Sequence, residues 1–103
     1  MIKRELTVRR IKLDCVQEYI RMHENIWPAL VEEYEQMGVR QVSCFIKGCD
    51  LYVYSEYEDR DDIDTSRPSE IVLVDDEWQR CMDLLMEKPQ HFIHPDEIFH
   101  MSL

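Results

Sequence analysis

The chain has 103 residues, of which 45% are apolar, and this length fits a single domain over 1–103. Its formal net charge of −10 repels phosphate backbones, so we expect no binding to nucleic acid. No stretch approaches the roughly 20 apolar residues of a membrane span, and the start MIKRELTVRR lacks the apolar core of an export signal, so we expect a cytoplasmic protein that binds no membrane.

The first part of the chain predicts a strand and then a helical region that a proline interrupts. Residues 4–11, RELTVRRI, alternate apolar and charged side chains, which is typical of a half-buried strand. From Cys15 onward the apolar spacing becomes helical. Pro28 removes a backbone donor and disfavours helix at the residue before it, so we expect two helical segments, roughly 15–24 and 28–37.

The second part of the chain predicts a hairpin, a helix and a last strand. In order we expect strands at 41–47 and 51–58, an acidic polar loop at 59–70, a helix at 75–87 and a strand at 97–103. The resulting order, β-α-β-β-α-β, is the ferredoxin-like pattern of an α+β protein. One face of its open sheet has no helix over it, so we expect that face to pack on a second copy in a homodimer.

Cysteine and glycine usage bears on cofactors. The four cysteines form no CxxC pair, so we expect reduced thiols, with Cys44 and Cys81 buried. His91 and His94 stand close together, but their spacing matches no helical zinc motif, so we expect no metal. With only two glycines the chain has no glycine-rich phosphate loop, and we expect no nucleotide cofactor.

The interrupted helical region holds the candidate chemistry. Tyr19 and His23 are four residues apart, so they share one face of a helix, and the break after them leaves room beside the imidazole. Histidine gives and takes protons near neutral pH, and a tyrosine hydroxyl can orient a ligand. A half-buried histidine also serves purely structural roles. Trp27 and Trp78 fit either the core or a platform for the C–H face of a sugar.

The stretch EYIRMHENIWPALVEEYEQMG, residues 18–38, resembles the L-rhamnose mutarotase family. The shared signature is a tyrosine, a histidine one turn later, an Ile-Trp-Pro run and a leucine. The resemblance extends over the chain: an opening strand, a hairpin after Gly38, a second helix with a tryptophan, and a terminal strand with Ile98-Phe99.

The resemblance implies both fold and function. Family members are dimeric α+β barrels of ferredoxin-like subunits, and they interconvert the α and β anomers of a deoxy-sugar without metal or cofactor. The family's proton donor matches His23, its ligand-binding tyrosine matches Tyr19, and Trp78 matches one of its two sugar-binding tryptophans. Val42 and Gln79 stand where the family has further aromatic sugar contacts. We therefore expect a mutarotase for a deoxy-hexose of the L-rhamnose or L-fucose type.

Two alternatives stay open at the level of sequence. A cofactor-independent monooxygenase shares this architecture, because fold does not fix function, and a broadly apolar cavity would favour it. A sugar-binding module that has lost catalysis is the other, and it is motivated by Val42 and Gln79.

Overall fold

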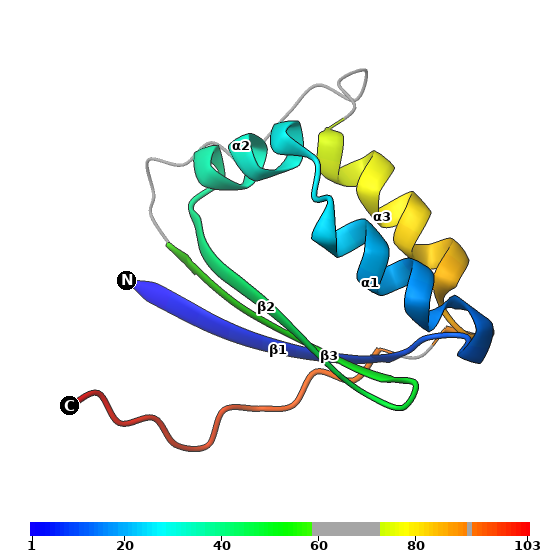
Figure 1. The fold of residues 1–103 in the computed structure, drawn as a ribbon. Coiled ribbons are helices and arrows are strands. Elements are labelled where there is room, and N and C mark those ends of the chain that lie inside the picture. Colours follow the sequence, from blue (N-terminus) through cyan, green and yellow to red (C-terminus); the bar gives the residue numbers. More distant parts are fainter. Residues whose placement is uncertain (59–72, 91) are drawn as a thin grey trace.

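The computed structural model describes residues 1–58, 73–90 and 92–103. The predicted acidic loop at 59–70 and His91 lie outside the described residues. The elements in chain order are β1 (Ile2–Arg10), a 3₁₀ turn (Leu13–Cys15), α1 (Val16–Glu24), α2 (Pro28–Gln36), β2 (Val39–Lys47), β3 (Asp50–Glu58) and α3 (Val74–Leu85). This confirms the α+β class, with α1 and α3 side by side over one face of the sheet (Figure 1). Within the described residues, no helix has the length and apolar character needed to cross a membrane.

The sheet is antiparallel, and β3 lies between β1 and β2. Leu51 of β3 is paired with Arg9 on one side and with Ile46 on the other, so these three side chains share a face. Leu51 and Ile46 pack into the core, which identifies this face as the one that the helices cover. Gly48, at φ 62°, forms the tight turn of the predicted hairpin together with Cys49.

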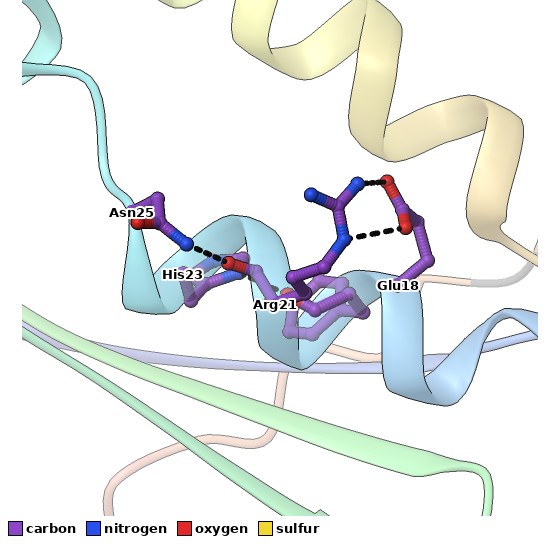
Figure 2. Close-up of polar contacts among 5 residues, drawn as sticks. Glu18, Arg21, His23 and Asn25 are labelled. Carbon is purple, nitrogen blue, oxygen red and sulfur yellow. Dashed lines mark hydrogen bonds and ion pairs between the residues drawn. The ribbon is translucent and has the colours of Figure 1, made fainter.

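The predicted interruption of the first helical region is confirmed. α1 ends at Glu24, and Asn25 closes it by donating a hydrogen bond from Nδ2 to the carbonyl oxygen of Arg21 at 3.1 Å (Figure 2). Trp27 is extended, with φ −67° and ψ 124°. Pro28 then opens α2 at the first helical position, where its missing N–H leaves no hydrogen bond unmade.

Carboxylates from two elements hold the start of α3. Glu33 of α2 accepts hydrogen bonds from the backbone N–H of Val74 at 2.9 Å and of Asp75 at 2.8 Å. Asp76 accepts a third from the N–H of Leu73 at 3.0 Å. These bonds satisfy donors that a helix leaves free at its positive end, so they join α2 to α3.

The core lies between the sheet and the helices. Its buried apolar members among the described residues are Ile11, Tyr19, Leu30, Leu51, Trp78, Met82 and Met86. Arg9 is buried beside them, and its guanidinium donates hydrogen bonds to Asp83 at 3.0 Å and to Gln90 at 2.7 Å. The ring of Phe92 lies 4.2 Å from the same guanidinium. Arg9 therefore joins β1 to α3 and to the segment that follows it.

The predicted last strand at 97–103 is wrong. The chain after α3 pairs with β1 at one point, where Val8 and Ile93 exchange both backbone hydrogen bonds, at 2.7 and 3.0 Å. The next hydrogen-bonded position on the C-terminal side is Pro95, which has no N–H, so the ladder stops. An Arg4–Glu97 ion pair at 2.9 Å then keeps the segment beside β1. The segment continues to the C-terminus without regular structure (Figure 1).

Candidate active site

The last turns of α1 bring Tyr19 and His23 together. Their rings stack with centroids 4.2 Å apart and an interplanar angle of 28°, as their spacing predicted. His23 Nδ1 lies 2.9 Å from the carbonyl oxygen of Tyr19. On the same helix, Glu18 and Arg21 form an ion pair with each other (Figure 2).

The contact at Nδ1 fixes the tautomer of His23. A carbonyl oxygen only accepts hydrogen bonds, so Nδ1 carries the hydrogen and donates it to Tyr19. In the neutral ring Nε2 is then the basic nitrogen, and in the protonated ring it is the available acid. No described residue hydrogen-bonds to Nε2. The arrangement therefore leaves one nitrogen of His23 open for proton exchange with a ligand.

Aromatic rings hold the imidazole on a second side. Trp78 of α3 meets the His23 ring edge-on, with centroids 5.1 Å apart and planes at 76°. Trp27 meets Trp78 in turn at 5.0 Å and 85°. Trp78 is only 4% exposed, whereas Trp27 is half-buried. Packed rings on two sides restrict the rotation of His23, which keeps its Nε2 in one place.

A cavity of about 240 Å³ opens between α1 and β2. Its lining side chains are Tyr19, Ile20, His23, Glu24, Cys44 and Ile46. The volume lies just below the roughly 300–1,000 Å³ range of pockets for drug-sized ligands, so the cavity fits a small molecule. Its wall mixes two aliphatic chains and a phenol ring with a thiol, an imidazole and a carboxylate, so it is not uniformly apolar as expected for a monooxygenase of aromatic substrates.

Tyr19 is the one buried side chain among those that line the cavity. Its hydroxyl donates a hydrogen bond to the Cys44 sulfur at 3.6 Å, across from α1 to β2. Burial, and next the neighbouring Cys44, raise the pKa of Tyr19 far above its ordinary value. Tyr19 is therefore a neutral hydrogen-bonding group and not a proton donor for catalysis near neutral pH.

The structure separates the four predicted site residues into two groups. Tyr19 and His23 line the cavity. Trp27 and Trp78 do not line it; they lie behind His23, and Trp78 belongs to the core. Their predicted contact with a sugar stays a prediction, and the contacts that the structure gives Trp78 are with the other rings.

The two positions that depart from the family lie outside this cavity. Val42 stands two residues before Cys44 on the same face of β2, and it is 47% exposed. Gln79 is exposed on α3 and donates a hydrogen bond to Asp75 at 3.1 Å. Val42 therefore continues the wall of β2 beyond the cavity, whereas Gln79 supports the start of α3.

Sequence reasoning did not find four of the lining residues. Ile20 and Glu24 are also four residues apart, so their spacing places them in a second row beside Tyr19 and His23. Cys44 and Ile46 come from β2, and no local pattern identifies a partner from another element. The prediction that Cys44 and Cys81 are buried is wrong. Cys44 is exposed on the edge strand β2, where its thiol faces the cavity, and Cys81 of α3 is only half-buried.

The C-terminal histidines do not assemble a ligand set in the part of the chain that the structure describes. No three His, Cys, Asp or Glu side chains gather there in a way that could hold a metal ion. His94 has a hydroxyl as its neighbour, with Nδ1 3.4 Å from Thr7 Oγ1.

An antiparallel sheet with helices on one face defines an α+β protein, and a histidine with one open ring nitrogen lies beside its small cavity. The model of the L-rhamnose mutarotase family matches residues 4–101. The chain therefore belongs to this family of carbohydrate isomerases.

The chain is also similar to individual proteins in sequence or in fold. The L-rhamnose mutarotase of Bacillus subtilis (strain 168) is 26% identical over 107 residues, which cover 98% of this chain and all of that protein. A UPF0734 protein of Dictyostelium discoideum is 28% identical over 79 residues, 73% of this chain, and the match spans 62% of that longer protein. The crystal structure of an L-rhamnose mutarotase from Formosa agariphila shares the fold, with a TM-score of 0.71, 19% identity and coverage of 97% of this chain and 99% of that one.

Proposed function

We propose that this protein interconverts the α and β anomers of a deoxy-hexose, with His23 as the group that moves the proton. The observation that carries the proposal is the open Nε2 of a histidine whose Nδ1 is bonded to the Tyr19 carbonyl oxygen. Because Nδ1 is occupied, one nitrogen alone serves both as acid and as base. Membership of the mutarotase family supports the same reaction.

The reaction needs little beyond a proton carrier. A pyranose opens when the ring oxygen gains a proton, the bond from that oxygen to the anomeric carbon breaks, and the anomeric hydroxyl loses a proton. Rotation about the bond from the anomeric carbon to its neighbour exposes the other face of the aldehyde. Reclosure reverses each proton transfer. In this chain, Nε2 of His23 protonates the ring oxygen and recovers that proton when the ring closes.

The cavity supports a 6-deoxy-hexose as the substrate class. Ile20 and Ile46 offer an aliphatic wall that suits the methyl group of such a sugar. The imidazole of His23 offers a hydrogen bond to the ring oxygen, and the Tyr19 hydroxyl, which donates to Cys44, offers an acceptor to a sugar hydroxyl. L-rhamnose is the first candidate, since the family is that of the L-rhamnose mutarotases, and L-fucose is the second because Val42 stands where the family has an aromatic contact.

Anomeric exchange measured by NMR saturation transfer tests the proposal. The panel is L-rhamnose, L-fucose and their stereoisomers, each with wild-type protein, with His23→Ala and with His94→Ala as a matched histidine control outside the cavity. We expect wild type and His94→Ala to accelerate exchange of at least one 6-deoxy sugar, and His23→Ala to lose most of the acceleration. Binding of a sugar without faster exchange would support the non-catalytic module instead.

We also infer a homodimer formed through the face of the sheet without helices. Val8, Tyr52 and Phe45 are paired across the three strands, on the face opposite Leu51. Phe45 is 60% exposed there. The chain end carries further apolar side chains that no described residue covers: Ile98, Phe99, Met101 and Leu103. A second copy would remove both apolar surfaces from water.

A cytoplasmic location agrees with the four free cysteines, because thiols stay reduced in that compartment.

A further inference from the structure

Glu24 is the one carboxylate among the described side chains that line the cavity. It lies one turn after Ile20 on α1 and directly after His23, so a carboxylate and an imidazole line the same small cavity. Among the described residues, Glu24 takes part in no hydrogen bond or ion pair. Its carboxylate is therefore free to accept a hydrogen bond from a ligand.

Glu24 is exposed at the end of α1, where its charge has no structural support. It is the last residue of α1, where the helix dipole disfavours negative charge. Arg21, one turn earlier, is already engaged by Glu18. The chain carries a net charge of −10, so one more unpaired carboxylate adds repulsion. Glu24 thus carries a charge that the helix dipole disfavours and that no described residue pairs with, and it lines the cavity. Such a residue is a candidate for contact with the ligand.

We propose that Glu24 is the general base that takes the proton of the anomeric hydroxyl while His23 protonates the ring oxygen. This rests on the mutarotase function proposed above. In the opening step, protonated His23 gives its Nε2 proton to the ring oxygen, the bond from that oxygen to the anomeric carbon breaks, and the Glu24 carboxylate takes the proton of the anomeric hydroxyl as the carbonyl forms.

Reclosure returns both groups to their starting state. The open-chain hydroxyl attacks the other face of the aldehyde and gives its proton to Nε2 of His23. The carbonyl oxygen takes the proton that Glu24 holds and becomes the anomeric hydroxyl. Each proton leaves and returns at the same residue, so the cycle needs no other co-reactant. A site with His23 alone has to pass one of these protons through water.

Substitution of Glu24 by glutamine tests this role, because it keeps the shape and removes the base. The matched control is Glu32→Gln, because Glu32 is an exposed glutamate of α2 that lies outside the cavity. We expect Glu24→Gln to lower the exchange rate at saturating sugar by about 10²-fold, with KM little changed, while Glu32→Gln matches wild type. In Glu24→Ala, added formate should restore part of the rate, since it supplies a small carboxylate.

The outcomes separate this inference from the proposed function. If wild type accelerates exchange and Glu24→Gln stays within about twofold of it, the role of Glu24 is refuted and the mutarotase activity stands. If Glu24→Gln raises KM alone and formate restores nothing, Glu24 binds the sugar but is not the base. If wild type exchanges no sugar of the panel, the proposed function fails and this inference with it. Thermal unfolding of each variant confirms that the fold is intact.

Discussion

Trp78→Phe distinguishes a tryptophan that supports the catalytic histidine from one that binds the sugar. Trp78 is 4% exposed, touches the His23 ring edge-on at 5.1 Å, and lies in the core instead of the cavity wall. Phenylalanine keeps a ring at this position but is smaller, so the substitution leaves a gap beside the imidazole.

The expected loss of stability follows from the burial of Trp78. Complete removal of a buried tryptophan side chain costs about 3–5 kcal/mol, so its replacement by the smaller ring should cost about 2 kcal/mol. For a domain of this size that corresponds to a fall in Tm of roughly 8–16 °C. Leu84→Ala, on the same helix but 68% exposed, is the control and should leave Tm nearly unchanged.

Kinetics complete the test of Trp78. A His23 that has lost one packed neighbour should show a lower exchange rate at saturating sugar with an almost unchanged KM, because the sugar contacts remain. Thermal unfolding and saturation transfer on the same sample provide both numbers. A large rise in KM together with an unchanged Tm would refute this reasoning, since it would place Trp78 in contact with the sugar.

Two further predictions concern the dimer and the C-terminal segment. Phe45→Glu introduces a charge on the face of the sheet without helices, and analytical ultracentrifugation should show a dimer for wild type and a monomer for the variant; equal masses would contradict the proposed interface. Hydrogen bonding to Arg4 is the main cause that lowers the pKa of Glu97, so the pair is formed at neutral pH and its contribution is lost as pH falls below the ordinary glutamate value of about 4.3. Amide exchange at Ile93 should therefore accelerate in acid relative to Leu51, and Glu97→Gln should remove this acid-specific difference; an Ile93 amide that stays equally protected at both pH values would contradict it.

The helices and the hairpin follow from local signals in the sequence. Pro28 sits at the start of α2 because its ring suits the first helical position, and this property is visible without coordinates. The pairing of Tyr19 with His23 follows from helical spacing in the same way. These signals act within a few residues, which is why reasoning from sequence recovers them.

The prediction of a last strand is wrong because strand formation in this segment depends on pairing with a partner strand. The run EIFHMSL has a strand-like composition, but pairing with β1 begins earlier, at Ile93, and Pro95 ends it at once. The role of Pro95 emerges only when the register with Val8 is known. The composition of the two segments does not determine the register in which they pair.

The cavity-lining residues of β2 could not be predicted from the sequence for a similar reason. Cys44 faces Tyr19 because β2 forms the edge of the sheet beside α1, and this is a tertiary relation between residues 25 positions apart. The same limit affects Trp78. Its position in the sequence fits both a core residue and a sugar platform, and only the ring contacts with His23 and Trp27 place it behind the imidazole.

The exchange rate of L-rhamnose and L-fucose anomers with His23→Ala is the decisive measurement for the role of His23. We expect a loss of about 10²–10⁴-fold relative to wild type, at unchanged Tm, because Nε2 of His23 is the proton carrier. Added imidazole should restore part of the rate. A folded His23→Ala protein that exchanges these sugars as fast as wild type would show that His23 is not the proton carrier.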